Sequence, residues 1–135
     1  MARDQFQTLT EPMYFTLLAL GEVRNGAEIT SWVSEITKGR IKLAPGTLYA
    51  LLAQFLENDL ITRVEVDKKG KYYKMTEEGR ELLEEEVKRL RLLIENYENH
   101  FDKWWLLIIR GSLLSDGNYF GYQRKRLALL KKYMK

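Results

Sequence analysis

The sequence has no cysteine and only one histidine among its 135 residues. Without cysteine, disulfide bonds, thiolate zinc sites and cysteine nucleophiles are excluded. The single histidine, His100, argues against histidine-based metal sites and against a histidine-dependent catalytic triad. No pair of carboxylates and no glycine-rich loop has the setting of a catalytic or phosphate-binding motif. We therefore expect no enzymatic activity, no cofactor and no metal site.

Long apolar runs are also missing. The longest extends from Trp104 to Ile109, far short of the ~20 residues that a membrane-spanning helix needs. Residues 1–5 (MARDQ) show no apolar segment of the kind found in secretory signals. We therefore expect a cytoplasmic protein without a membrane partner.

The composition is that of a folded protein with an uneven charge. Hydrophobic residues make up 45% and charged residues 30%, so the chain can bury a core. Basic and acidic residues number 10 and 9 in residues 1–75, 4 and 8 in 76–100, and 8 and 2 in 101–135. The net charge of +3 is compatible with nucleic-acid binding but does not establish it.

Two short helices are predicted before residue 40. Thr10 can cap the first, with Pro12 in its first turn and Gly21 near its end. Asn25 and Gly26 form a turn signal. An apolar stripe at helical spacing follows and predicts a second helix that stops near residues 38–39; its members are Ile29, Trp32, Val33 and Ile36.

A third helix is predicted from Pro45 to Asn58. One apolar face is formed by Leu48, Leu51, Leu52, Phe55 and Leu56, and the opposite side carries Thr47, Ala50, Ala53 and Gln54, with Tyr49 at its flank. Ala44 stands at the cap position without a side-chain acceptor, so the helix start is weaker by about 1 kcal/mol than with a serine cap.

After residue 59 the helical spacing of apolar residues ends. Residues 60–66 and 71–75 are predicted strands, and residues 67–70 (DKKG) are a positively charged hairpin turn. Three short helices followed by such a hairpin are typical of a winged helix-turn-helix. The expected fold is therefore mainly α with a small β-hairpin, with a winged helix-turn-helix DNA-binding domain in residues 1–76 and a helical dimerisation domain in residues 77–135.

The long helix after Thr76 carries an apolar seam with alternating spacings of 4 and 3 residues. Its members are Leu83, Val87, Leu90, Ile94, Tyr97, Phe101, Trp104 and Ile108. A heptad seam of this length requires a partner helix, from the same chain or from a second copy. A final basic helix is predicted from about Gly121 to Met134.

Three segments carry a family resemblance. Residues 43–49 (LAPGTLY), 56–61 (LENDLI) and 71–83 (KYYKMTEEGRELL) resemble the signature of PadR-type transcriptional regulators, and the likeness covers roughly residues 10–100. It implies a dimeric and usually repressing DNA-binding protein whose long fourth helix makes the dimer. It also implies that Pro45, Gly46, Thr47, Tyr49 and Lys71 lie near DNA.

The DNA-binding candidates come from three places. The third helix would enter the major groove, and the preceding turn and the hairpin would contact phosphates. The full set is Lys38, Arg40, Lys42, Pro45, Gly46, Thr47, Tyr49, Gln54, Lys68, Lys69 and Lys71. The alternatives are that the turn and hairpin cations are merely solvated and that Tyr49 packs against the second helix.

Two further functional points stay open. Trp104 and Trp105 either form part of the dimer contact, which is the simpler interpretation, or hold an aromatic or drug-like effector as some PadR-like regulators do. The third helix has no Lys or Arg between Ala44 and Asn58, although arginine makes the commonest specific base contact. A winged-helix protein–protein adaptor without sequence-specific DNA binding is therefore the alternative function.

Overall fold

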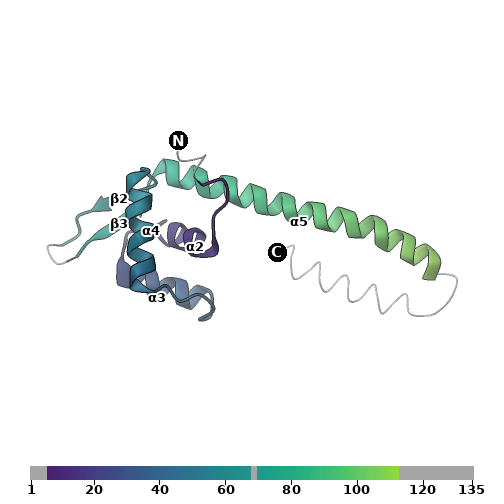
Figure 1. Cartoon of the computed structure of the whole chain (residues 1–135), viewed down its shortest axis with the longest axis horizontal. Helices are drawn as coiled ribbons and strands as arrows, with labels where there is room; N and C mark the ends of the chain where they lie inside the picture. The colour runs from purple at the N-terminus through teal and green to yellow at the C-terminus, as the bar shows by residue number, and fades with distance from the viewer. Residues whose placement is uncertain (1–5, 68–69, 113–135) are drawn as a thin grey trace. The chain divides into compact units, whose positions relative to one another are not determined.

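The structure is a computed structural model that describes residues 6–67 and 70–112, with side chains up to Phe101. It divides into two compact units between Leu90 and Arg91. The first unit contains three short helices, a small sheet and the beginning of a long helix (Figure 1). In the described part of the chain, no helix is both long and apolar enough to cross a membrane.

The first two helices begin with side-chain caps. Helix α2 spans Glu11–Ala19, and the Thr10 hydroxyl accepts a hydrogen bond from the Met13 amide, which confirms the predicted start. Helix α3 spans Gly26–Ile36. Asn25, predicted as a turn residue, is its N-cap: its Oδ1 accepts from the Glu28 amide at 2.8 Å, and the Glu28 carboxylate accepts from the Asn25 amide. This reciprocal pair satisfies two amides that a helix start otherwise leaves free.

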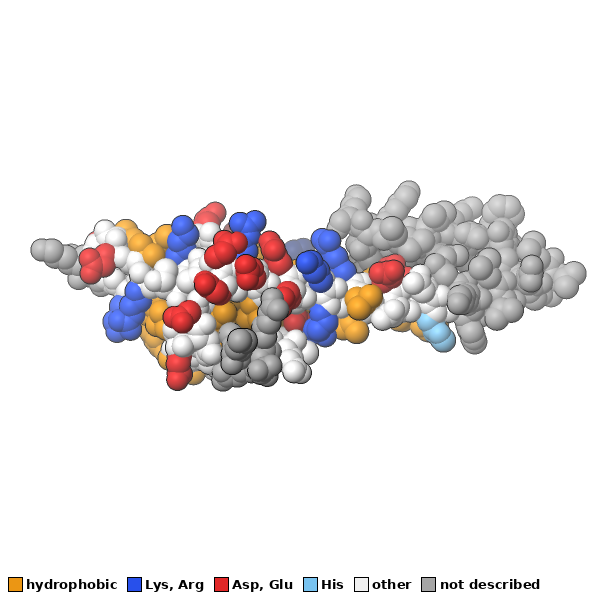
Figure 2. Space-filling model, turned by 90° about the horizontal axis from the view of Figure 1, so that it is seen from above, with side chains coloured by type: hydrophobic (Ala, Val, Ile, Leu, Met, Phe, Trp, Pro, Cys, Tyr) orange, Lys and Arg blue, Asp and Glu red, His pale blue; other side chains and the backbone are white. Residues whose placement is uncertain are grey.

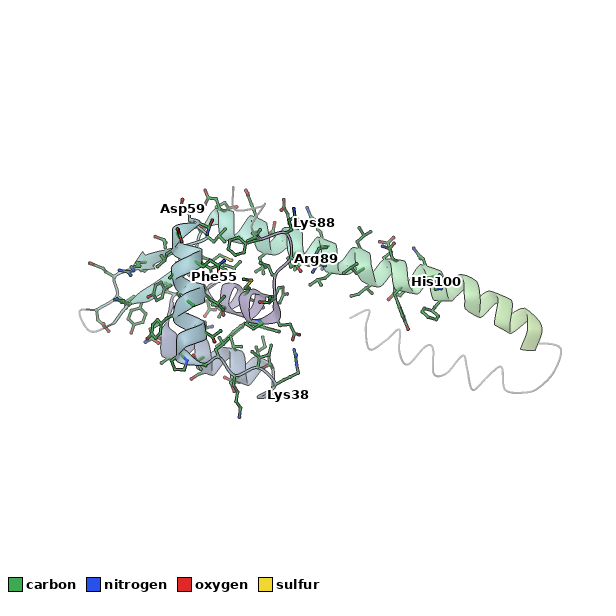
Figure 3. All side chains as sticks on the ribbon, in the orientation of Figure 1. Lys38, Phe55, Asp59, Lys88, Arg89 and His100 are labelled. Carbon is green, nitrogen blue, oxygen red and sulfur yellow. The ribbon has the colours of Figure 1, made fainter. Side chains whose placement is uncertain are left out.

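Helix α4 spans Pro45–Glu57, as the sequence predicts, and Ala44 provides no side-chain cap. Four of its apolar side chains are buried: Leu48, Leu51, Leu52 and Phe55. Phe55 is fully covered and points from α4 into the unit (Figure 3). One face of α4 therefore belongs to the core, which also receives α2, α3 and the sheet.

The sheet has three antiparallel strands in the order β1-β3-β2. Strands β2 (Ile61–Val64) and β3 (Tyr72–Met75) form the predicted hairpin, with Ile61 opposite Met75 and Val64 opposite Tyr72. Both strands are shorter than predicted. The two-residue strand β1 (Arg24–Asn25) pairs with the other edge of β3 and was not predicted, because two residues carry no period.

Helix α5 spans Glu77–Ser112. Its first turn packs tightly on the chain before β2: a Cβ added to Gly79 would lie 2.1 Å from the Leu60 carbonyl oxygen and 2.9 Å from Met75 Cγ. A glycine at this position is what allows α5 to approach so closely.

The N-terminal segment is tied to the start of α5. Phe6 is buried in the core and its ring centroid lies 6.0 Å from that of Phe55. The Leu9 amide donates to the Glu86 carboxylate at 3.3 Å. Glu86 is 4% exposed and forms an ion pair with Arg89 on the next turn of α5. The hydrogen bond from Arg89 is the main cause that holds the pKa of Glu86 below its ordinary value.

Candidate nucleic-acid interface

Helix α4 presents a small, uncharged face to solvent. Thr47, Ala50 and Ala53 are exposed, and Gln54 is half-buried. These residues lie opposite the buried side chains of the same helix, so the predicted division of α4 into two faces is confirmed. An α-helix with side chains is ~10–12 Å across, close to the ~12 Å width of the major groove.

Within the described residues, the fold gives no reason for glycine at position 46. Apart from its chain neighbours and the backbone of α4, no described atom lies within 4 Å of the place where its Cβ would be, and Gly46 lacks the positive φ that favours glycine. Glycine nevertheless lowers helix stability relative to alanine. Its bare backbone lies in the first turn of α4, beside Pro45 and Thr47, both of which are exposed.

Tyr49 lies at the border between core and solvent. It is 59% exposed. Its hydroxyl would nevertheless be 3.6 Å from a Cβ placed on Gly26, the first residue of α3. The side chain therefore leans over the start of α3 and leaves most of its surface open.

The turn between α3 and α4 carries three exposed cations, Lys38, Arg40 and Lys42. Lys38 adopts φ 53° and Gly39 φ 76°, and these left-handed residues reverse the chain after α3 (Figure 3). Arg40 is already partnered: its guanidinium donates to the Glu11 carboxylate of α2 at 2.9 Å. This hydrogen bond lowers the pKa of Glu11. Sequence patterns carry no signal for such a pair, whose members are 29 residues apart.

The hairpin is basic beyond the residues that the sequence singled out. Lys71 is exposed, and so are Arg63 on β2 and Lys74 on β3. Lys74 lies opposite Thr62 in the strand register. Lys74 could have been proposed from the strand alternation, because it follows the buried Tyr73 and so lies on the solvent side. Arg63 could not, because it shares its face with the buried Ile61 and lies opposite Tyr73, yet it is exposed. The predicted contacts Lys68 and Lys69 lie outside the described residues.

The opposite charge gathers elsewhere on the same unit. Seen from above, acidic side chains cluster where α5 begins, with a few basic ones between them (Figure 2). Glu77, Glu78, Glu81, Glu84 and Glu85 are exposed in these first turns. This acidic surface would repel a polyanion, whereas the turn and the hairpin would attract one.

The apolar seam of α5 divides into a buried and an exposed part. Leu83 is 7% exposed and belongs to the core of its own unit, so it is already covered without a partner. Val87 is half-buried. Exposure is 38% at Leu90, 49% at Ile94 and 65% at Tyr97.

Two exposed leucines lie outside the heptad pattern, and the side chains at the end of the seam are not described. Leu92 and Leu93 are 56% and 52% exposed. The Tyr97 and Phe101 ring centroids are 4.6 Å apart, and His100 meets Phe101 edge-on. The side chains of Trp104, Trp105 and Ile108 lie outside the described part, as does the predicted helix from Gly121.

Comparison with protein families identifies the family to which the chain belongs. Residues 16–85 match the transcriptional regulator PadR-like family. The chain belongs to this family. The match contains α3, α4, the whole sheet and the first turns of α5, so it confirms both the fold and the family that the three sequence segments suggested.

Solved structures agree with the PadR-like assignment. A PadR-like transcription factor from Bacteroides fragilis is 26% identical, with a TM-score of 0.57 over 74% of this chain and 97% of that one. A PadR family transcription regulator from Clostridium difficile is 28% identical, with a TM-score of 0.54 over 66% and 95%. A winged-helix DNA-binding protein from STIV shares the fold at 21% identity, with a TM-score of 0.50 over 67% and 91%. Among curated proteins, none matches this chain in sequence.

The PadR-like family and its fold are those of transcriptional regulators, which are generally not enzymes. DNA is accordingly the class of partner that the family supports. Among the side chains that the structure describes, no group of three or more His, Asp or Glu residues is arranged to hold a metal ion.

Proposed function

We propose that this PadR-like regulator is a repressor that binds operator DNA as a homodimer, with α4 in the major groove of each half-site. The observation that carries the proposal is the two-sided character of α4. Its apolar face is buried, while Thr47, Ala50 and Ala53 remain uncovered by the chain. In a winged helix-turn-helix this is the surface that reads base edges. Occupying an operator would repress by excluding the polymerase.

Phosphate contacts would come from both sides of α4. The turn supplies Lys38 and Lys42, and the hairpin supplies Lys71, with Lys68 and Lys69 as predicted contacts. Arg40 would reach a phosphate only by exchanging its bond to Glu11. Such contacts supply affinity and register but little sequence information.

The dimer would form along α5. Leu90, Ile94 and Tyr97 follow one another at heptad spacing and are more than one third exposed. A seam of this kind favours a partner helix, and residues 77–135 would serve as the dimerisation part. Leu83 is not included in the proposed dimer interface, because its side chain is buried in the core of the first unit.

An effector would act through the same helix. Trp104 and Trp105 follow the exposed seam in sequence, and aromatic side chains from two copies could enclose a planar ligand. Such a ligand would change the separation of the two reading helices, which must match half-sites about one DNA turn apart.

A mobility-shift titration with the DNA upstream of its own gene tests the main proposal. We expect a sequence-selective shift at physiological salt that scrambled DNA of equal length does not produce. A folded dimer that shifts both duplexes equally, or neither, would contradict operator binding.

A protein–protein adaptor is the second candidate, because α4 exposes no cation anywhere between Ala44 and Asn58. DNA binding by phosphate contacts would weaken steeply with salt. An adaptor would instead show salt-independent retention of a protein partner at fixed stoichiometry, together with no selective shift.

A further inference from the structure

The side chains that α4 offers to a base pair form a restricted chemical set. Apart from Pro45 and Gly46 in the first turn, Tyr49 at the flank, and Leu56 and Glu57 at the end, the exposed or half-buried positions offer a short list of groups. These are the methyl groups of Ala50 and Ala53, the hydroxyl and methyl of Thr47, and the amide of Gln54. Neither arginine nor lysine occurs on this helix. Guanine is normally read by a bidentate cation on its O6 and N7 atoms, so the helix lacks the group that recognises G·C pairs best.

Each remaining group has a partner on an A·T pair. Methyl groups pack against the C5-methyl of thymine, and a glutamine amide can donate to N7 and accept from N6 of adenine. Thr47 and Gln54 lie seven residues apart, two helical turns, on the same side of α4. Ala50 lies between them in sequence and is exposed on the adjoining strip of the helix surface.

Close approach is needed for methyl recognition, because dispersion and apolar burial act only at contact distance. Because residues 50 and 53 are alanine and residue 46 is glycine, only short side chains protrude from the exposed face of α4 at these positions. A long side chain at any of these positions would hold the helix backbone away from the base edges.

We infer that α4 reads A·T pairs, mainly through thymine C5-methyl groups and the Gln54 amide, and that guanine contacts contribute little to its specificity. The inference rests on the proposed insertion of α4 into the major groove. It adds the identity of the base pairs and the atoms by which they are read.

The experiment uses the full chain and a duplex selected by it from a random-sequence library. That duplex is then synthesised with deoxyuridine in place of one thymine at a time, which removes only the C5-methyl, and with 7-deazaguanine in place of each guanine. We expect deoxyuridine to weaken binding about fourfold at one or more positions of each half-site, the loss equivalent to one buried methyl. The 7-deazaguanine duplexes should bind within about twofold of the parent, since N7 is not read.

Substitutions in the protein connect the effect to α4. In Ala50→Gly or Thr47→Ser, one deoxyuridine position should lose its penalty, because the methyl on the protein side is already gone. Thermal unfolding of each variant identifies loss of fold, and Thr47→Ser keeps the helix and the hydroxyl. If neither variant changes any deoxyuridine penalty, α4 is not the reader of those methyls and the inference is wrong.

Failure of this inference differs from failure of the proposed function. A selected duplex that is sensitive to 7-deazaguanine and insensitive to deoxyuridine would overturn A·T reading while leaving operator binding intact. A library from which no sequence is enriched would overturn operator binding itself, and A·T reading with it.

Discussion

At the residue scale, a substitution at Gly46 should affect stability and DNA binding in opposite directions. Its Cβ would meet no atom within 4 Å, so Gly46→Ala should leave the fold intact and raise stability by a few tenths of a kcal/mol, up to about 0.5, through helix propensity. DNA affinity should nevertheless fall roughly tenfold, because the added methyl stands where the backbone approaches the duplex. Thermal unfolding and fluorescence anisotropy with the selected duplex measure the two effects. Unchanged affinity would show that DNA does not approach this turn.

Tyr49 tests the flank of the same helix. With 59% of its surface exposed, Tyr49→Ala should weaken operator binding about tenfold and change the melting temperature little. Tyr49→Phe is the matched control, since it keeps the ring that lies over Gly26 and removes only the hydroxyl. A large fall in melting temperature for Tyr49→Ala would show that Tyr49 stabilises the fold as a core residue does.

Glu86 gives a prediction on pH. Its pKa is lowered chiefly by the hydrogen bond from Arg89. A lowered folded-state pKa means that the ionised form stabilises the fold fully above the ordinary value of 4.5 and that this contribution is lost as the pH falls through the folded pKa. Glu86→Gln should therefore be less stable than the parent by about 1–2 kcal/mol at pH 7, and the two should converge on acidification.

Denaturant unfolding at several pH values measures this difference. The matched control is Glu84→Gln, because Glu84 is 59% exposed and pairs with Arg80 on the surface; its stability should differ little from the parent at any pH. A Glu86→Gln difference that stays constant between pH 7 and pH 3 would contradict the assignment.

At the scale of elements, the helices were the most predictable part. Ile29 and Val33 in α3, and the four buried residues of α4, repeat with a helical period long enough to stand out from chance. The strand β1 has two residues and no period. Phe6 joins the core from a segment without regular structure. Both the strand β1 and the burial of Phe6 depend on contacts between residues far apart in the sequence, and local sequence patterns carry no signal for such contacts.

The candidate nucleic-acid interface was predictable in part for the same reason. The exposed face of α4 follows from its period, so Thr47, Ala50 and Ala53 could be identified in the sequence. The Glu11–Arg40 pair could not, since it joins α2 to a turn 29 residues away. Leu83 shows the converse case: a heptad position that satisfies the pattern while its side chain is buried in its own unit.

Gly79 tests the packing of the first turn of α5 on the chain before β2. In Gly79→Ala the new methyl would lie 2.1 Å from the backbone oxygen of Leu60, so the helix must move. We expect a loss of about 2–3 kcal/mol, seen as a fall of roughly 10 °C in melting temperature. Gly46→Ala is the control for the same substitution in open space. Equal melting temperatures for the two variants would contradict the close contact at Gly79.

At the scale of the whole molecule, the proposed dimer is the feature on which the proposed operator binding depends. Lysine at both Leu90 and Ile94 would place two charges within the proposed seam, and sedimentation should then show monomers. Leu92→Lys is the matched control, because Leu92 is exposed even more than Leu90 and Ile94 but falls about half a turn away from the seam by helical spacing. Dimers that persist in the double variant would place the interface elsewhere.

Loss of the dimer should also weaken DNA binding without unfolding the first unit, whose core contains neither Leu90 nor Ile94. A monomer would engage one half-site and lose the gain that two linked contacts provide. Sedimentation and anisotropy on the same samples relate assembly to affinity.

Hydroxyl-radical footprinting of the protein on its selected duplex, with the mass of the complex measured in parallel, tests the central claim most directly. The account predicts two protected segments about one DNA turn apart and two protein chains per duplex. One protected segment with one chain per duplex, or uniform protection without preference for position, would contradict it.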